Sequence, residues 1–234
     1  DTFLVLSRDI TESVVQEQKL AHEAALNAAV LSLQQEVDGD DEAAFLQRGV
    51  EFAEQLTGSA MAFIHFVHDD QENIELVSWS TATLRQFCET IEDSHYPISQ
   101  AGIWADALRQ RAPVVINDYL GAENKRGLPD GHAELQRLIS LPVIEGSKVR
   151  LLIGVANKPT DYAGADVDTL KLLAHSVWSL VKRRRQDITI HRLSEALEQS
   201  PYPVLITDDE VRIQYVNQSF THYSGYTADE VIGK

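Results

Sequence analysis

Apolar residues repeat at helical spacing near the start of the chain. They follow one another in steps of four and three residues, with one glutamate among them: Ile10, Val14, Glu17, Ala21, Ala24, Ala28 and Leu31. This heptad spacing predicts a helix over about 11–36, which Asp9 or Thr11 can cap. Two arrangements fit the pattern and remain open. The helix pairs with its copy in a dimer, or it packs alone on its own domain.

The middle of the chain mixes helical and strand patterns. The break VDGDD at 37–41 separates the first helix from a second, which ends near Gly58. Alternating or apolar runs then predict short strands joined by turn residues: about 60–68, 74–80, 95–98, 113–116, 138–144 and 149–156. A short helix is expected over about 102–110, and a loop over 120–133.

A second long helix begins near Asp166 and continues to about residue 199. Leu170, Leu173, Val177 and Leu180 stand at heptad spacing, but the apolar residues resume at Ile190, Leu193 and Leu197, one position early. Such a phase shift changes the local winding of a coiled coil. Pro201 and Pro203 end the helix. Its ~50 Å length predicts a connection between modules. A hairpin over 203–208 and 211–216 follows, and Asn217 is expected to cap a short helix.

The composition narrows the possible partners. A net charge of −16 repels phosphate groups, so no nucleic-acid binding is expected. No apolar run approaches the ~20 residues of a membrane span, so we expect no membrane contact by this segment. Cys88 is the single cysteine and can form no internal disulfide, which fits the cytoplasm. The sequence begins and ends abruptly, as expected for a segment of a longer protein.

The two ends of the chain resemble parts of PAS domains. Residues 6–12, LSRDITE, resemble the exit of a PAS domain. Residues 203–234 resemble the entry of another at the recurring positions Asp208, Asn217, Phe220, Gly225, Tyr226, Glu230 and Gly233. The resemblance implies four pieces around the middle domain: the C-terminal end of a PAS domain (1–12), a linker or signalling helix (13–36), a signalling helix (185–202) and the N-terminal part of a second PAS domain (203–234).

The middle of the chain, over 37–184, resembles a GAF domain. The residues that carry the resemblance are, in order, HYPI, AGIWAD, PVVINDY, KRGLP, LPV and GVANK. They are similar to GAF domains of bacterial and archaeal sensor proteins, which alternate PAS and GAF modules ahead of a histidine kinase or a GGDEF diguanylate cyclase. The resemblance implies an α+β fold, with a GAF-like antiparallel sheet and long N- and C-terminal signalling helices.

The same resemblance implies a function in signal transduction. The expected role is a regulatory, non-catalytic segment of a two-component or diguanylate cyclase protein. It binds a small-molecule ligand, unknown in identity, and relays the signal through coiled-coil helices. The expected partners are a second copy in a parallel homodimer and the adjacent PAS and output domains of the same chain. Two alternatives remain open: a ligand-free GAF spacer that dimerises, and a haem-binding redox or gas sensor. A reductase with this fold uses several cysteines, which a single Cys88 does not supply.

Four residues near the second long helix resemble the signature of cyclic-nucleotide GAF domains. They are Asn157, Lys158, Tyr162 and Asp166, but Val167 stands where that signature has a glutamate. Lys158 can reach Asp166 and tie the loop to the helix, and Asn157 can bond turn backbone. Direct ligand contact by Asn157 and Lys158 is the other interpretation.

Two loops carry further candidate ligand-binding groups. Asn117, Asp118 and Tyr119 follow the strand PVVI and offer donors, acceptors and a ring. They bind a ligand, or they cap a turn and cover the core. Lys125, Arg126 and His132 lie in a loop with several glycines. They hold an anion, or they form a solvated basic loop.

Aromatic residues predict the walls of a pocket. Trp79, Phe87, Tyr96 and Trp104 are the candidates, and packing in the core is the competing interpretation. Trp104 stands at a helix start, which is the usual lid position in the family that the chain resembles. Haem requires one axial His or Cys, and the sequence offers His65, Cys88, His95 and His132. No catalytic motif of a known hydrolase, kinase or metalloenzyme occurs, so we expect no catalytic or metal-binding residues in this segment.

Overall fold

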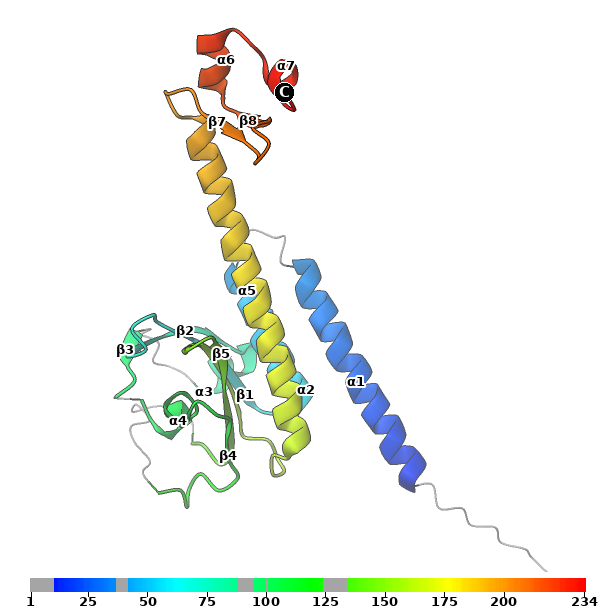
Figure 1. Ribbon diagram of the computed structural model, residues 1–234. Helices are drawn as coiled ribbons and strands as arrows, with labels where there is room; N and C mark the ends of the chain where they lie inside the picture. Colours follow the sequence, from blue (N-terminus) through cyan, green and yellow to red (C-terminus); the bar gives the residue numbers. More distant parts are fainter. Residues whose placement is uncertain (1–10, 37–41, 88–94, 100, 124–133) are drawn as a thin grey trace, which may run out of the picture. The chain divides into compact units, whose positions relative to one another are not determined.

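The computed structural model describes residues 11–36, 42–87, 95–99, 101–123 and 134–234. Their elements follow in this order along the chain (Figure 1): α1 (Thr11–Glu36), α2 (Glu42–Thr57), β1 (Met61–Val67), β2 (Asn73–Trp79), α3 (Thr81–Phe87), β3 (His95–Pro97), the 3₁₀ helix η1 (Ile103–Ala105), α4 (Asp106–Gln110), β4 (Val114–Ile116), β5 (Leu138–Glu145), β6 (Lys148–Ala156), α5 (Gly164–Glu198), β7 (Leu205–Thr207), β8 (Ile213–Val216), α6 (Gln218–Ser224) and α7 (Ala228–Val231).

The main sheet is antiparallel throughout its described pairs. Its strands lie in the order β3-β2-β1-β6-β5-β4, so β1 and β6 form the centre. The register places Phe63 of β1 opposite Trp79 on one side and Gly154 on the other. Gly154 in turn faces Ser140 of β5. Side chains on a strand alternate between the two faces of its sheet, so each face forms its own core.

The two faces of the sheet bury different elements. Helices α2 and α5 cover one face (Figure 1), where Ile64, Ile153 and Leu173 belong to a single apolar cluster. Gly49 allows close contact there, since an added Cβ would lie 3.1 Å from Cγ2 of Val177 on α5. The other face carries η1 and α4, and its cluster includes Phe63, Trp104 and Tyr119. The sheet therefore separates a helical side from a side formed by loops and short helices.

The predicted α+β fold with an antiparallel sheet and long helices is confirmed. The strands lie within one or two residues of the predicted ranges. Helix α3 was not predicted, and the helix expected over 102–110 is divided into η1 and α4. Arg111 follows α4 with φ 55°, a left-handed conformation that ends the helix.

The interpretation of α5 as one coiled-coil seam with a phase shift is corrected. Leu170, Leu173, Val177 and Leu180 are buried in the core of their own sheet domain. The second stripe is exposed, and Leu193, for example, is 61% accessible. The two stripes differ in phase, and they also differ in their surroundings. The first packs on the sheet, whereas Ile190, Leu193 and Leu197 of the second remain 64%, 61% and 39% accessible in the single chain.

Helix α1 presents a packed face and an exposed face. Ala29 and Leu33 are buried, and the helix packs on α2. His22 adds a contact to α5, because its Nε2 lies 2.8 Å from Oγ1 of Thr169. The predicted heptad residues from Val14 to Leu31 occupy the other face, where Val14 and Leu31 are exposed, and Ile10 lies outside the described residues. Packing on its own domain is thus established for the later turns of α1, and the heptad face stays accessible.

The compact unit over 182–234 contains the end of α5 and the second hairpin. Strands β7 and β8 pair antiparallel. The prediction that Asn217 caps a helix is confirmed, since its side chain accepts a hydrogen bond from the backbone N–H of Phe220. The amide of Asn217 also donates to the carbonyl of Leu197 at 3.0 Å. Asn217 therefore holds the start of α6 against the end of α5.

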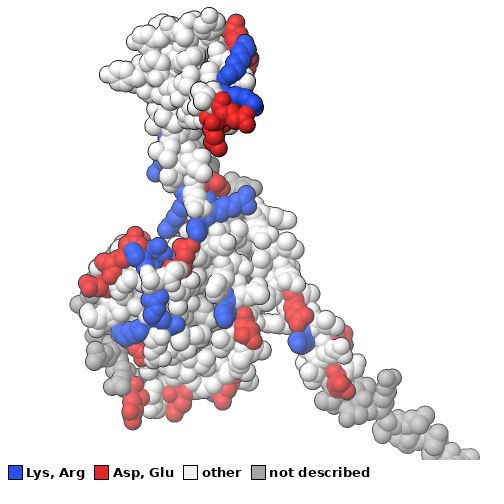
Figure 2. All heavy atoms as spheres, viewed as in Figure 1, with Lys and Arg blue, Asp and Glu red and all other residues white. Residues whose placement is uncertain are grey.

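Charged side chains of both signs are interspersed on the visible face of the molecule (Figure 2). One ion-pair group ties the turn between β1 and β2 to β6: Asp69 lies 2.9 Å from Nζ of Lys148 and 2.5 Å from Nη1 of Arg150. Exposed pairs of this kind contribute little to stability. No helix in the described part of the chain has the length and apolar character needed to cross a membrane.

Candidate functional site

An aromatic layer lies on the sheet face opposite α2 and α5. It consists of Phe63, His65, Trp79 and Trp104, and we use this name for these four residues. The Phe63 ring is central: its centroid lies 5.3 Å from His65, 5.7 Å from Trp79 and 5.7 Å from Trp104, each in an edge-on arrangement. Such geometry is favourable for aromatic pairs. The layer unites the two predicted pocket residues Trp79 and Trp104 with His65, which the sequence offered only as a possible axial ligand of haem, and with Phe63, which was not predicted.

Phe63 reaches its position because its neighbour on β6 is a glycine. An added Cβ at Gly154 would lie 2.1 Å from Cζ of Phe63, far inside van der Waals contact. The Phe63 ring therefore lies directly against the backbone of the central strand. A glycine inside a strand often marks such a close approach, and this signal in the sequence could have identified the layer.

His65 is enclosed within the layer. Only 2% of its surface is accessible, and its ring stacks on Trp104 at 4.6 Å with an interplanar angle of 22°. Burial lowers the pKa of His65 to about 3, since a charged imidazolium would lose its hydration. At neutral pH the ring is uncharged and acts as a flat stacking surface.

Trp104 is positioned by an arginine that the sequence analysis did not single out. Nη2 of Arg109 donates to the carbonyls of Ile98 and Ala101, each at 2.7 Å. Nη1 donates to the carbonyl of Gly102 at 3.2 Å and pairs with Asp106. The guanidinium has enough donors to satisfy all of these acceptors. Arg109 thus holds the turn that leads into η1 and carries Trp104.

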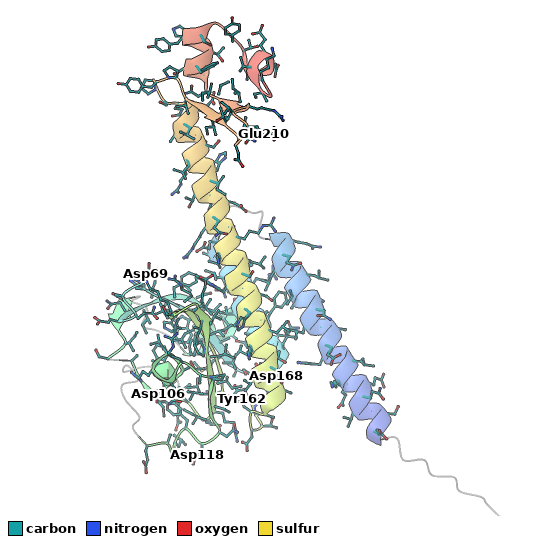
Figure 3. The ribbon with its side chains drawn as sticks, viewed as in Figure 1. Asp69, Asp106, Asp118, Tyr162, Asp168 and Glu210 are labelled. Carbon is teal, nitrogen blue, oxygen red and sulfur yellow. The ribbon has the colours of Figure 1, made fainter. Side chains whose placement is uncertain are left out.

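The predicted group Asn117, Asp118 and Tyr119 divides into three roles. Asn117 binds the backbone of Tyr162: its Oδ1 accepts from the N–H at 2.7 Å, and its Nδ2 donates to the carbonyl at 3.1 Å. Asp118 accepts from the N–H of Gly121 and caps an outer turn (Figure 3). Tyr119 is buried in the cluster that contains Phe63 and Trp104, and burial raises the pKa of its hydroxyl. Of the three, only Tyr119 belongs to that cluster.

Asn157 and Lys158 make the structural tie that was one of their two interpretations. Nζ of Lys158 lies 2.7 Å from Oδ1 of Asp166, whose Oδ2 accepts from the N–H of Ala163 at the start of α5. Asn157 adopts φ 59°, and its side chain bonds the backbone of Gln136 and Glu134. Ligand contact by Asn157 and Lys158 stays a prediction.

Tyr162 belongs to the core on the helical side of the sheet. Its ring packs in the cluster formed with α2 and α5 (Figure 3). Its hydroxyl lies 2.7 Å from Oγ of Ser59. Burial raises the pKa of Tyr162 to about 12, so the phenol stays protonated. Tyr162 therefore anchors the loop before α5.

The remaining predicted site residues are described in part or not at all. Cys88, Lys125, Arg126 and His132 lie outside the described residues. His95 and Tyr96 lie in β3, where their backbones pair with Glu75 and Ile74. Phe87 ends α3. Within the described residues, no three side chains of His, Cys, Asp or Glu are grouped to hold a metal ion.

A polar network connects the segment around Trp79 to α2. Oγ of Ser80 donates to the carboxylate of Glu54 and lies 2.6 Å from Oγ1 of Thr83. Oγ1 of Thr81 donates to Glu51 at 2.7 Å. Burial is the main cause that raises the pKa of Glu54, and the Ser80 hydrogen bond offsets it in part.

The network has a third link one turn earlier on α2. Oγ of Ser78 donates to Oε1 of Gln47 at 2.9 Å. Gln47, Glu51 and Glu54 stand at helical spacing on one face of α2, so three successive turns bond the residues that flank Trp79. We call these contacts the α2 polar network. This spacing was present in the sequence, but its partners Ser78 on β2, Thr81 on α3 and Ser80 between these elements were not predicted.

The chain is similar to known sensory domains along most of its length. A family profile described as GAF domain matches residues 39–182, and one described as PAS domain matches residues 191–234. The methyl sulfide methyltransferase-associated sensor of Methanosarcina acetivorans is 31% identical over 206 residues. These residues cover 85% of this chain and 20% of that protein, so the chain spans about a fifth of the relative's length.

Solved structures share the fold at low identity. The GAF domain of the Acinetobacter phosphoenolpyruvate-protein phosphotransferase superposes with a TM-score of 0.59 at 16% identity, covering 71% of this chain and 95% of that one. The free methionine-R-sulfoxide reductase of Neisseria meningitidis, solved in complex with its substrate, gives 0.57 at 12% identity and covers 80% and 98%. These likenesses bear on the fold alone.

Proposed function

Because this chain belongs to the GAF domain family and also contains a match to a PAS domain, we propose that it is the regulatory segment of a larger signalling protein. In this proposal the GAF domain binds a small molecule against the aromatic layer, and the signal passes through the long helices to an output domain, a kinase or a cyclase. The segment itself is non-catalytic. The relative from Methanosarcina is a sensor by name, and only this general role is carried over.

One observation carries the proposal: the aromatic layer is connected to the helical side of the molecule. Ser78, Ser80 and Thr81 flank Trp79 and bond α2 through the α2 polar network. Helix α2 packs on α1, and its Gly49 lies against Val177 of α5. A ligand that shifts Trp79 would therefore act on the helix that contacts both long helices. Two arrangements of this network would be selected by the presence or absence of ligand.

Native mass spectrometry and an absorption spectrum of the purified chain test ligand binding. We expect an added mass that is lost on unfolding, which would identify the chemical class of the ligand. A Soret band would favour the haem-binding alternative. An unmodified mass, together with no thermal shift by any compound of a metabolite panel, would contradict ligand binding and favour the ligand-free spacer.

The same spectra test the proposed parallel homodimer. The stripe formed by Ile190, Leu193 and Leu197 on α5 and the heptad face of α1 are both exposed in the single chain, and apolar seams of this kind pair in coiled coils. We expect a dimer that Leu193→Glu converts to monomer. Ile188→Glu is the matched control, because Ile188 is also exposed but lies on the opposite face of the helix. Equal effects of the two substitutions would contradict pairing through this stripe.

The relay is tested by removing one hydroxyl from the α2 polar network. Ser80 is fully buried, and its hydrogen bond to Glu54 is of the charge-assisted kind, worth about 1.5–3 kcal/mol. Ser80→Ala should raise amide hydrogen exchange several-fold in both α2 and α3, because both elements lose the shared contact.

Ser176→Ala is the matched control for this experiment. The Ser176 hydroxyl bonds only the carbonyl of Leu172 within its own helix among the contacts described. It should leave exchange in α2 and α3 unchanged. If Ser80→Ala affected α3 alone, the proposed connection to the helical side would be wrong.

A further inference from the structure

Two buried hydroxyl groups on the side of the sheet that carries the aromatic layer have no hydrogen-bond partner among the described residues. They are Oγ of Ser140, a residue with 0% exposure, and the phenolic oxygen of Tyr119, a residue with 3% exposure. Ser140 lies two residues after Leu138 on β5, so the alternation of the strand places both on the same face of the sheet. Leu138 and Tyr119 belong to the cluster that contains Phe63 and Trp104.

Such groups are uncommon and energetically unfavourable. More than about 90% of buried polar groups in proteins are hydrogen-bonded, and each buried donor or acceptor left without a partner costs about 1–3 kcal/mol. Alanine and phenylalanine would fill the positions of Ser140 and Tyr119 without this cost. The two hydroxyls are thus explained if a molecule that enters the layer supplies their partners.

The aromatic layer on the same side of the sheet presents flat, uncharged surfaces. Phe63, Trp79 and Trp104 present ring surfaces, and His65 stacks on Trp104. Burial suppresses the charge of His65, because desolvation lowers the pKa to about 3. The same desolvation acts on a charged ligand. Arg109 is bonded to backbone carbonyls and Asp106.

We propose that the aromatic layer binds an uncharged, planar heteroaromatic compound, which stacks on the rings of the layer and hydrogen-bonds to the hydroxyls of Ser140 and Tyr119. This inference rests on the proposed ligand-binding function and names the ligand class for that site. Both hydroxyls are buried, so the ligand enters when the cover formed by η1 and α4 moves. These elements contain three and five residues. Trp104 is then displaced from His65, and the ligand ring takes its place in the stack.

The test compares a neutral probe with a charged one on the intact chain. The neutral probe is 4-quinazolinone, a planar bicyclic ring with donor and acceptor atoms at its edge. The charged probe is its carboxylate derivative. We expect the neutral probe to raise the melting temperature and change the tryptophan fluorescence. The carboxylate should bind at least about tenfold more weakly, because its charge must be desolvated.

Two variants distinguish a ligand-binding role of the hydroxyls from a purely structural one, because they should weaken probe binding without lowering the melting temperature. Ser140→Ala and Tyr119→Phe should each bind the neutral probe about 5- to 10-fold more weakly. Without probe, each should melt at the same temperature as the parent chain or about 2 °C higher, because a buried unpaired hydroxyl is removed. Ser176→Ala and Tyr223→Phe are the matched controls, and Tyr223 is exposed.

The possible outcomes show whether the proposed ligand class is wrong, or the proposed ligand-binding function itself. Stronger binding of the carboxylate, or unchanged binding by both variants, would overturn the ligand class. If the mass spectra then showed a bound ionic ligand, the ligand-binding function would stand while this inference fell. No binding of either probe would also overturn the class, and together with an unmodified mass it would contradict the proposed function as well.

Discussion

Lowering the pH from about 7 to about 4.5 is expected to reduce the free energy of unfolding of the sheet domain. In the His65→Leu variant this reduction should be smaller by about 2–3 kcal/mol than in the parent chain. Burial lowers the pKa of His65 from an ordinary value of 6.5 to about 3 in the folded chain. The unfolded chain therefore binds a proton on this ring below pH 6.5, and the folded chain does not. The stability contributed by the neutral ring is complete above 6.5 and falls as the pH decreases toward about 3.

Urea unfolding at the two pH values measures this contribution. All three tryptophans of the chain, Trp79, Trp104 and Trp178, lie within the unit over 1–181, so their fluorescence follows the sheet domain. Carboxylates also change protonation in this range, and only the difference between the parent chain and His65→Leu isolates the imidazole. His175→Gln, which removes an exposed histidine, controls for the loss of a histidine as such. If the free energy of unfolding changed with pH equally in the parent chain and in His65→Leu, His65 would be protonated in the folded chain as readily as in the unfolded chain, and the prediction would be wrong.

The low pKa also bears on the function of the aromatic layer. A folded-state pKa of about 3 lies far below neutral pH, so His65 does not change charge near neutrality while the domain stays folded. His65 therefore suits an uncharged stacking partner, and a pH-sensing role for this residue is disfavoured. The same constancy would keep the proposed ligand site neutral over the physiological range.

The secondary structure was largely predictable because most elements are long or strongly periodic. Helix α1 and the strands of both central hairpins follow from spacing alone. Helix α3, TATLRQF, was missed because seven residues give too little periodicity and it follows β2 after one residue. The two apolar stripes of α5 were found, but their difference in phase was misinterpreted. A sequence pattern shows which residues are apolar, and only the packing shows which partner each stripe contacts.

The site was less predictable, because its contacts depend on strand register. Trp79 and Trp104 were predicted as pocket residues, but their common neighbour Phe63 was not. Phe63 meets Trp79 only through the pairing of β1 with β2, and Gly154 only through the pairing of β1 with β6. Asn117 binds the backbone of Tyr162, a residue 45 positions away. Donor and acceptor chemistry was visible at Asn117, whereas the choice between a ligand and the protein backbone was not.

Gly154→Ala is expected to lower the free energy of unfolding strongly, because it adds a methyl group where the Phe63 ring already lies. The new Cβ would lie 2.1 Å from Cζ of Phe63, and Cε1 and Cε2 of that ring are nearly as close, at 2.5 and 2.7 Å. The ring edge cannot yield easily, because the aromatic layer surrounds it and the backbone of β6 lies beneath it. Overpacking of this kind costs about 1–3 kcal/mol, and we expect the upper end of that range.

Two further variants separate this clash from a general effect of alanine. Gly164→Ala is the matched control, since an added Cβ at Gly164 meets nothing within 4 Å, and its stability should be unchanged or slightly higher. Phe63→Leu removes the opposing ring, so the double variant should lose clearly less stability than the sum of the two single variants. Strict additivity in urea unfolding would mean that Phe63 does not contact Gly154 in solution. A non-additive result would show that the Phe63 ring lies against the backbone of β6. It would thereby also support the position of the aromatic layer, from which the ligand site is inferred.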